Sequence, residues 1–146
     1  MREPEKAVFT NMCMIYDNDG NVLVQNRKKS WCGIAFPGGH VEKLESIVDS
    51  TIREIKEETG LDIWNLELCG VKQWFNDTEG RNVCFLFKTK SFSGELISSD
   101  EGENFWIKKS DILNYDLANN FDIMYKVFED KNINEHYHGK DSDILK

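Results

Sequence analysis

Residues 53–60 read REIKEETG, and this stretch ends the segment that decides how the chain folds. On a helix of 3.6 residues per turn, the inward-facing side chains of residues 45–59 fall within an arc of roughly 140°. They are Ile47, Val48, Thr51, Ile52 and Ile55. The spacing therefore predicts an amphipathic helix over 45–59. Gly60 is expected to end it, because glycine readily adopts the left-handed conformation.

Three glutamates of this helix, Glu54, Glu57 and Glu58, project close together. Glu54 and Glu58 point in nearly the same direction, and Glu57 lies roughly 60° to one side of Glu54. Like charges at this spacing repel each other, and negative charges near a helix C-terminus oppose the helix dipole. Arg53 points elsewhere and is expected to pair with Asp49. The cluster therefore predicts a divalent cation with oxygen ligands, Mg²⁺ or Mn²⁺ rather than zinc, and a solvated acidic face is the alternative.

The segments around the helix show strand-like and helical patterns. Residues 8–17 and 22–27 are rich in β-formers and flank the turn DNDGN, so they predict a β-hairpin. Further strands are expected at 66–76, 82–92 and 104–109, and a second helix at 119–130. This order predicts an α/β or α+β fold, in which helices pack on a mixed sheet. No linker or repeat interrupts it, so we expect one domain over 1–146, with about 131–146 left unassigned as a loosely ordered polar tail.

The residues before and along the helix follow a fixed spacing. Gly39 is followed after five residues by Glu45, and seven residues later the chain reads REIKEETGL, at 53–61. This resembles the Nudix box, G-x5-E-x7-R-E-U-x-E-E-x-G-U, with every position filled. The resemblance implies the Nudix fold, an α/β/α sandwich with a mixed sheet, and a hydrolase that cleaves nucleoside diphosphate derivatives by attack of water on phosphorus.

The resemblance also implies roles for individual residues. In the family, the carbonyl of the residue matching Gly38 and the glutamates matching Glu54, Glu57 and Glu58 bind divalent metal, here Mg²⁺ or Mn²⁺. The paired glycines, Gly38 and Gly39, let the backbone approach a metal or phosphate closely. Residues that support the geometry of the box are Glu45, Arg53 and Gly60.

Two residues outside the box resemble further parts of the family site. Glu101, in the loop SSDEGENFW, resembles an additional metal ligand and catalytic carboxylate of the MutT-like branch; Asp100 and Glu103 are its neighbours, and a plain polar loop is the alternative. Which carboxylate takes the proton of the attacking water stays open between Glu101 and the box glutamates. Arg27 resembles the arginine that family members place near the substrate phosphates.

The substrate is indicated by the segment before the second predicted helix. Asn119 resembles the asparagine with which MutT-like proteins bind an oxidised guanine, with Asn120 as a competitor and simple helix capping as the alternative. This predicts hydrolysis of a nucleoside triphosphate to the monophosphate and pyrophosphate, with 8-oxo-dGTP as an example and DNA repair as the context. Alternatives are ADP-ribose, dinucleoside polyphosphates, RNA 5′ ends, or a non-catalytic nucleotide sensor. A sensor would be expected to have lost box glutamates.

Several aromatic side chains are candidates for stacking on the base of a nucleotide. They are Trp31, Phe36, Trp74, Phe75, Phe85 and Trp106.

Composition limits the class of protein. The net charge of −8 argues against a stable nucleic-acid complex and requires cations at a phosphate site. No signal peptide or membrane-spanning run is visible, and the four cysteines form no C-x-x-C pair, so a cytoplasmic protein without membrane partners is expected. His136 and His138 are spaced like a pair of metal ligands, but the polar surroundings favour a mobile tail instead.

Overall fold

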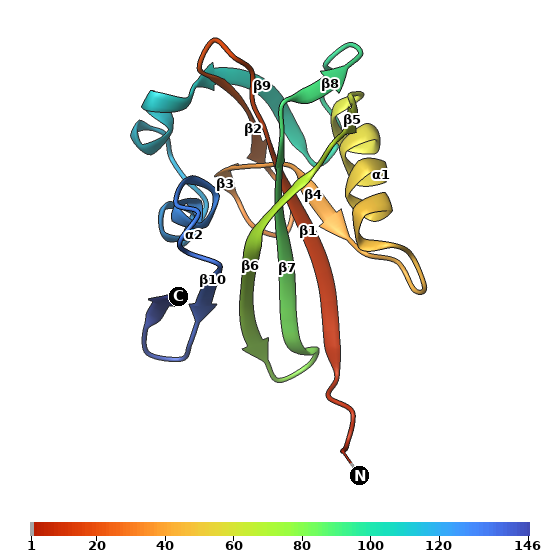
Figure 1. The fold of residues 1–146 in the computed structure, drawn as a ribbon, viewed down its shortest axis with the longest axis vertical. Coiled ribbons are helices and arrows are strands. Elements are labelled where there is room, and N and C mark those ends of the chain that lie inside the picture. Colours follow the sequence, from red (N-terminus) through yellow and green to blue (C-terminus); the bar gives the residue numbers. More distant parts are fainter. Residues whose placement is uncertain (1) are drawn as a thin grey trace.

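The computed structural model describes residues 2–146, and its largest element is a six-stranded mixed sheet (Figure 1). The strand order is β11-β10-β6-β7-β1-β4. β1 runs parallel to β7 and β10 runs parallel to β6, whereas the other neighbours are antiparallel. The strands are β1 (Ala7–Ile15), β4 (Gly38–His40), β6 (Glu67–Asn76), β7 (Gly80–Thr89), β10 (Glu135–His138) and β11 (Asp143–Leu145). The predicted mixed sheet is confirmed.

Two smaller sheets complete the strand arrangement. They are β3-β2-β9, formed by Gly33–Ala35, Asn21–Arg27 and Gly102–Lys108, and β5-β8, formed by Asp62–Trp64 and Ser91–Ser93. The prediction that β1 and β2 pair as a hairpin is wrong, although the chain does turn between them. The two strands share one bridge, between Tyr16 and Val22, and then enter different sheets. β1 takes β7 and β4 as neighbours, and such distant pairings leave no local signal in the sequence.

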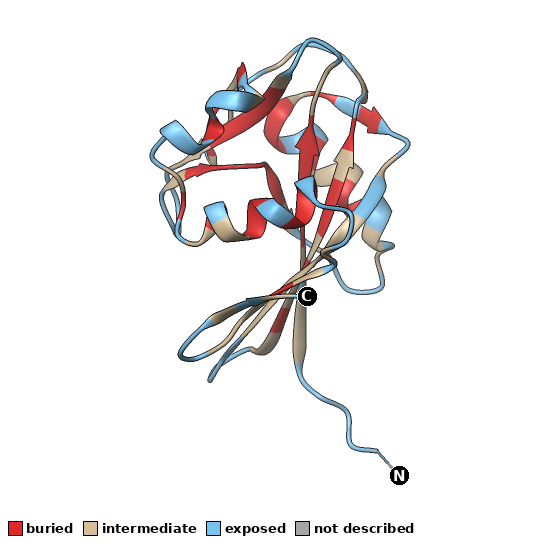
Figure 2. Ribbon diagram, turned by 60° about the vertical axis from the view of Figure 1, so that its left-hand side comes forward, coloured by how far each residue is buried: buried red, intermediate tan, exposed pale blue. Residues whose placement is uncertain are grey.

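The alternating side chains of β1 enter two separate cores. Met14 packs in a cluster that contains Phe121 of helix α2 (Phe121–Glu129), whereas Ile15 packs in a cluster that contains Ile55 of helix α1 (Ile47–Thr59). One strand can serve two cores because successive side chains point to opposite faces of a sheet. The helices therefore cover opposite faces, and Figure 2 shows the buried residues concentrated where helices and strands meet. The predicted α/β/α sandwich is confirmed.

Helix α1 has clear signals at both ends. Ser46 is its N-cap, and the Ser46 hydroxyl accepts a hydrogen bond from the Asp49 amide at 3.2 Å. Gly60 ends the helix with φ of 80°, and its N–H donates to the Lys56 carbonyl, as a left-handed cap does. No helix within residues 2–146 combines the length and apolar character that a bilayer crossing requires.

The C-terminal segment is ordered, so the expectation of a loose tail is wrong. After α2, strand β10 pairs in parallel with β6, and β11 folds back antiparallel on β10. His136 is fully buried in this arrangement. The sequence concealed these strands because they are short and polar, and because their partner β6 lies about 60 positions earlier in the chain. A short 3₁₀ helix, η1 (Lys109–Asn114), precedes α2.

Candidate active site

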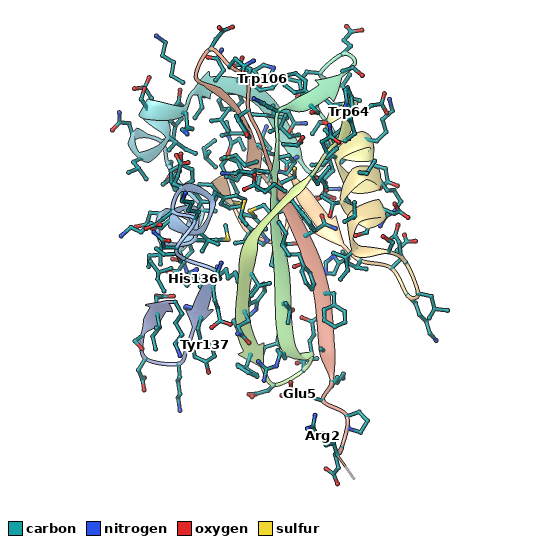
Figure 3. All side chains as sticks on the ribbon, viewed as in Figure 1. Arg2, Glu5, Trp64, Trp106, His136 and Tyr137 are labelled. Carbon is teal, nitrogen blue, oxygen red and sulfur yellow. The ribbon has the colours of Figure 1, made fainter. Side chains whose placement is uncertain are left out.

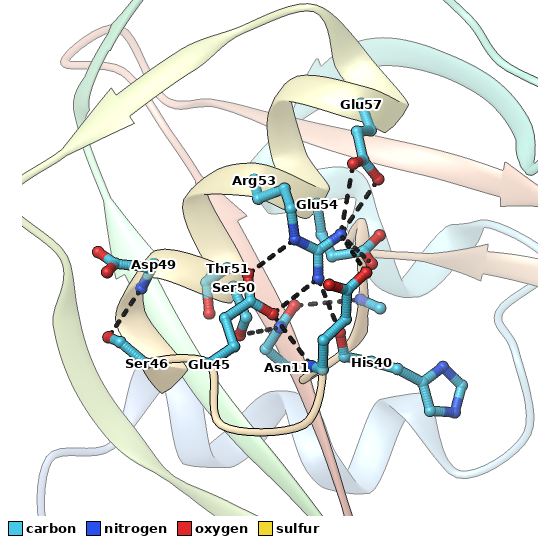
Figure 4. Close-up of polar contacts among 12 residues, drawn as sticks. Asn11, His40, Glu45, Ser46, Asp49, Ser50, Thr51, Arg53, Glu54 and Glu57 are labelled. Atoms are coloured by element: carbon cyan, nitrogen blue, oxygen red, sulfur yellow. Dashed lines mark hydrogen bonds and ion pairs between the residues drawn. The ribbon is translucent and has the colours of Figure 1, made fainter.

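Arg53 fastens helix α1 to the loop that precedes it (Figure 4). Its Nε donates to Glu45 Oε2 at 2.8 Å, and its Nη2 donates to Glu45 Oε1 at 2.9 Å. Nη2 also donates to the His40 carbonyl at 3.1 Å. Paired guanidinium–carboxylate bonds of this kind are strong and directional. The loop after β4 is therefore held against the helix by one side chain.

The remaining guanidinium nitrogen of Arg53 contacts two glutamates of the helix. Nη1 donates to Glu54 Oε1 at 3.0 Å and to Glu57 Oε2 at 3.2 Å. The expected pairing of Arg53 with Asp49 is therefore wrong. The long side chain of Arg53 reaches across the helix surface, so the direction of its Cα–Cβ bond does not determine its partners.

The Arg53 hydrogen bonds lower the pKa of Glu45 to about 2, from an ordinary value of 4.5. A lowered folded-state pKa stabilises the protein above pH 4.5, and that stabilisation is lost as the pH falls toward about 2. Glu45→Gln should therefore unfold more readily than the wild type at neutral pH and match it near pH 2. Denaturant unfolding across this pH range measures the difference.

Glu42→Gln is the matched control, because Glu42 is 70% exposed and its carboxylate lies 3.8 Å from the Arg53 guanidinium. We expect a smaller difference from the wild type for this variant. A stability loss in Glu45→Gln that stayed constant from neutral to acid pH would show that the charge of Glu45 contributes nothing.

The two glycines of β4 make room for the site. A Cβ on Gly39 would lie 2.3 Å from the carboxyl carbon of Glu54, so the carboxylate occupies the space that a side chain would need. A Cβ on Gly38 would lie 2.0 Å from the backbone oxygen of Asn11. The Asn11 side chain also accepts a hydrogen bond from the Gly39 amide at 3.1 Å. Glycine at both positions lets β4 pass close to β1 and to the helix carboxylates.

Glu58 is the buried member of the three glutamates. Gln25 of β2 donates to its Oε1 at 3.1 Å, and the nearest Arg27 nitrogen lies 4.0 Å away. Burial raises the pKa of Glu58 to about 8, because the charged form is poorly solvated there and Glu54 lies beside it. Gln25 is a functional candidate that the sequence did not reveal, although a polar residue inside the apolar run of β2 is a usable signal.

Arg27 and Glu101 lie together, although 74 positions separate them in the sequence. Arg27 Nη2 is 3.5 Å from Glu101 Oε2, and Arg27 Nη1 donates to Gln25 Oε1 at 3.2 Å. The guanidinium carbon lies 4.4 Å from the centre of the Trp31 ring, within cation–π range. Pairing of β2 with β9 places Arg27 opposite Gly102, the residue after Glu101. The sheet register thus brings both predicted residues to one end of the cavity.

These elements surround a cavity of about 710 Å³. The predicted residues that line it are Arg27, Gly38, Gly39, Glu54, Glu58, Glu101 and Asn119, together with the aromatic candidates Trp31, Phe36 and Trp74. Glu57 lies beyond its wall with a side chain that is 58% exposed, and Arg53 connects it to Glu54. The remaining predicted residues, which do not line the cavity, are Glu45, Arg53 and Gly60 and the aromatic candidates Phe75, Phe85 and Trp106.

Asn119 does not cap helix α2. The N-cap position belongs to Asn120, whose backbone has φ of 64° and whose side chain makes no capping hydrogen bond. Asn119 precedes it with an exposed side chain at the cavity. The capping explanation for Asn119 is therefore wrong.

The sequence did not predict which residues form one wall of the cavity. It is formed by Lys72 and Trp74 of β6 and by Asn82 of β7, which pairs with Trp74. Lys72 Nζ lies 5.4 Å from the centre of the Trp74 ring. Asn82 is only 4% exposed, and within the described chain its Nδ2 has no hydrogen-bond partner. Strand alternation places Lys72 and Trp74 on one face, but the sequence does not tell which face looks into the cavity.

The donor atoms at the glutamate end fit a hard divalent cation. Carboxylates and a backbone carbonyl are the ligands that Mg²⁺ and Mn²⁺ prefer, and Gly39 leaves the Glu54 carboxylate the space it needs. A buried carboxylate such as Glu58, beside a second one, is also favoured by a nearby cation. Among residues 2–146, the one trio of potential ligand residues with all ligand atoms within 4.8 Å lies elsewhere. The helix glutamates would therefore have to draw together around an ion.

The family profile that matches this chain is the NUDIX domain, over residues 8–130. The chain belongs to the Nudix family. Nudix proteins of this kind are hydrolases that act on small-molecule nucleotides and generally use divalent metal ions, so the predicted enzyme class is confirmed.

Three known Nudix proteins illustrate the similarity. The Nudix hydrolase YvcI of Bacillus subtilis is 36% identical over 112 residues, which cover 73% of this chain and 69% of YvcI. An ADP-ribose pyrophosphatase of Methanocaldococcus jannaschii is 34% identical over 93 residues, 61% of this chain and 54% of that protein. The crystal structure of a MutT protein from Bacillus halodurans superposes with a TM-score of 0.78 at 27% identity, covering 95% of this chain and 97% of that one.

Proposed function

We propose that this Nudix hydrolase converts a nucleoside triphosphate to the monophosphate and pyrophosphate, with an oxidised purine nucleotide such as 8-oxo-dGTP as its substrate. The proposal rests on the observation that carboxylates line the same cavity as Asn119, an asparagine that does not cap helix α2. Glu54 and Glu58 line it together with Asn119, and its volume of about 710 Å³ lies within the usual range for small-molecule sites.

The carboxylate end of the cavity would hold the phosphates through Mg²⁺ or Mn²⁺. Glu54, Glu57, Glu58 and the Gly38 carbonyl would be the ligands, with Glu101 as an additional one. A bound divalent ion neutralises charge on the phosphoryl oxygens and makes a coordinated water more acidic. Arg27 adds a positive charge at the same end, and its contact with Trp31 holds the guanidinium in place.

We assign to Glu101 the role of taking a proton from the attacking water, with the box glutamates as the alternatives. Glu54 and Glu57 accept hydrogen bonds from Arg53, and Glu58 is buried against Gln25. The Glu101 side chain is 39% exposed, and its contact with Arg27 is a loose one at 3.5 Å. A general base must come within hydrogen-bond reach of the water that it deprotonates, and a partly exposed carboxylate at the cavity has the freedom to do so.

The far end of the cavity would receive the base. Trp74 offers an aromatic face for stacking, and Asn82 offers a buried amide group without a partner within the described residues. A buried donor that lacks a partner costs free energy, which a ligand acceptor would recover. Asn119 supplies a second amide that can both donate and accept. These groups suit a purine with polar edges.

ADP-ribose is the second candidate substrate. The similarity to the Methanocaldococcus jannaschii ADP-ribose pyrophosphatase supports it, whereas the fold similarity to the Bacillus halodurans MutT protein supports the MutT-like branch. The two reactions release different products. Cleavage of the triphosphate between its α and β phosphorus atoms yields pyrophosphate, and cleavage of ADP-ribose yields AMP and ribose 5-phosphate.

The test is a panel of nucleotides in Mg²⁺, with pyrophosphate, orthophosphate and AMP measured separately. The panel contains 8-oxo-dGTP, dGTP, the other nucleoside triphosphates, ADP-ribose and a dinucleoside polyphosphate. We expect the highest kcat/KM for 8-oxo-dGTP, with pyrophosphate as the product. Fastest release of AMP from ADP-ribose would overturn the proposed substrate and leave the family assignment intact.

Asn119→Ala should lower the preference for 8-oxo-dGTP over dGTP by about tenfold, the loss expected for one hydrogen bond to a buried ligand group. Hydrolysis itself should persist, because Asn119 does not belong to the carboxylate end. Asn114→Ala is a matched control, since Asn114 ends η1 and does not line the cavity. An unchanged substrate ratio in Asn119→Ala would remove the asparagine from base recognition.

We also propose that the chain works as one domain in the cytoplasm. The four cysteines, Cys13, Cys32, Cys69 and Cys84, are all free, which suits a reducing compartment. Removal of an oxidised nucleotide before its incorporation would place the enzyme in the protection of DNA.

A further inference from the structure

The C-terminal hairpin carries a second cluster of potential metal ligands, separate from the glutamates of α1. It consists of His136 and His138 of β10 and Asp143 of β11, whose ligand atoms all lie within 4.8 Å of one another. It is the one such trio of His, Cys, Asp or Glu within residues 2–146. Figure 3 labels His136 on this hairpin, whose two strands form one edge of the large sheet.

The pairing of the two strands brings the three side chains together. His136 and His138 are two residues apart and therefore project from the same face of β10. His138 lies directly opposite Asp143 in the antiparallel register, and His136 is the diagonal neighbour. One oxygen, Asp143 Oδ1, lies 2.7 Å from His136 Nε2 and 2.7 Å from His138 Nδ1. Three potential ligand atoms from two strands thus lie together, and hydrogen bonds through Asp143 Oδ1 join them when no ion is bound.

The burial of these side chains differs in a way that suits a binding site. The His136 side chain is fully buried, whereas 39% of the His138 side chain and 22% of the Asp143 side chain remain accessible. His136 Nε2 is the ring nitrogen that faces Asp143, so Nε2 is the atom that this histidine presents to an ion. The cluster is fixed on its inner side and open on its outer side.

We propose that His136, His138 and Asp143 bind a transition-metal ion such as Zn²⁺. Two imidazoles and one carboxylate form a ligand set that suits zinc, with one position left for water. The glutamates of α1 offer oxygen ligands only and suit Mg²⁺. The two sites therefore select different ions.

The position of the cluster assigns a role to the ion. In the large sheet, β10 is four strands away from β4, which carries Gly38 and Gly39, so roughly 19 Å separates them. His138 nevertheless lines the far side of the nucleotide cavity. An ion bound by β10 and β11 would fasten the hairpin and fix that wall, because metal binding by folded ligands stabilises the folded state.

Lys72 is the positive group that opposes such an ion. It pairs with His136 in the parallel register of β6 and β10, so the two side chains share one face of the sheet. An ammonium group near a divalent cation weakens its binding by repulsion. Lys72→Met should therefore bind Zn²⁺ more tightly than the wild type, a result that a site located elsewhere would not give.

The test is a Zn²⁺ titration of chelator-treated protein in excess Mg²⁺, followed by calorimetry and thermal unfolding. We expect one Zn²⁺ per chain and a rise in Tm of roughly 9 °C when the free Zn²⁺ concentration is a hundred times Kd. His138→Gln and Asp143→Asn should lose both effects. His40→Gln, at the third histidine of the chain, and Glu57→Gln, at the Mg²⁺ site, should keep both effects.

Two spectroscopic measurements make the result independent of the variants' stability. Co²⁺ in place of Zn²⁺ should give visible absorption bands of a nitrogen-ligated ion, and Zn²⁺ should shift the ring nitrogen signals of His136 and His138 in NMR spectra of the wild type. Unshifted histidine signals, or Zn²⁺ binding of equal strength in His138→Gln and Asp143→Asn, would overturn the site. Either outcome leaves the proposed nucleotide hydrolysis untouched.

Discussion

Glu57→Gln is expected to lose most Mg²⁺-dependent hydrolysis while keeping its fold. Glutamine has the shape of glutamate without its charge, and a neutral amide is a weaker ligand for Mg²⁺. The Glu57 side chain is 58% exposed and contacts Arg53 at 3.2 Å, so the substitution disturbs little packing. We expect kcat/KM to fall roughly 10²- to 10³-fold, the loss typical of removing one group that stabilises transition-state charge. Steady-state hydrolysis and thermal unfolding, measured side by side, separate activity from stability.

Glu67→Gln is the matched control for this variant. Glu67 is also exposed, at 65%, and its carboxylate lies 3.8 Å from the ammonium of Lys88, but it is remote from the cavity. The control should keep full activity. Glu58→Gln extends the test to the buried carboxylate, where the new amide oxygen can still accept from Gln25. Full activity in Glu57→Gln and Glu58→Gln would show that neither side chain is a metal ligand.

Gly39→Ala is expected to lose activity with little loss of stability. The new Cβ would lie 2.3 Å from the Glu54 carboxyl carbon and would push that carboxylate out of place. A side-chain terminus can rotate away, so the fold should tolerate the change. A displacement of about 1 Å of a catalytic group lowers the rate roughly 10²-fold. We expect a loss of that order in kcat.

Gly38→Ala is the variant to compare with Gly39→Ala, because its new Cβ would meet backbone atoms. The nearest atom, at 2.0 Å, is the carbonyl oxygen of Asn11 on β1, which cannot rotate away. We therefore expect Gly38→Ala to destabilise the fold by about 1–3 kcal/mol or more, as overpacking does. Normal turnover by Gly39→Ala would contradict the placement of Glu54 in the site, and a stable Gly38→Ala would contradict the close approach of β4 and β1.

The helix and its carboxylates were predictable because their signals are local. The apolar spacing and Gly60 act within or directly beside α1, whereas the helix starts two residues after the predicted position, at Ile47, because Ser46 is its N-cap. The partners of Arg53 were not predictable, since a long side chain reaches residues on either side of its own position. A helical wheel gives the direction of Cβ and not the location of a guanidinium group.

Features that depend on strand pairing could be predicted from the sequence only in part. The parallel partner of β1 is β7, more than 70 positions later, so the divergence of β1 and β2 left no trace in their own sequences. The same holds for β10, whose pairing with β6 buries His136. Trp74 was one of several aromatic candidates, and its place beside Asn82 follows from the register of β6 and β7.

The most direct test is a crystal structure with Mn²⁺ and a nucleoside triphosphate analogue whose α–β bridging oxygen is replaced by an imido group. Anomalous scattering locates Mn²⁺ independently of the protein coordinates. We expect Mn²⁺ between the carboxylates of α1 and the phosphate oxygens, with the Gly38 carbonyl directed toward it and the base near Asn119. An analogue bound in the cavity with no Mn²⁺ beside Glu54, Glu57 or Glu58 would contradict the account.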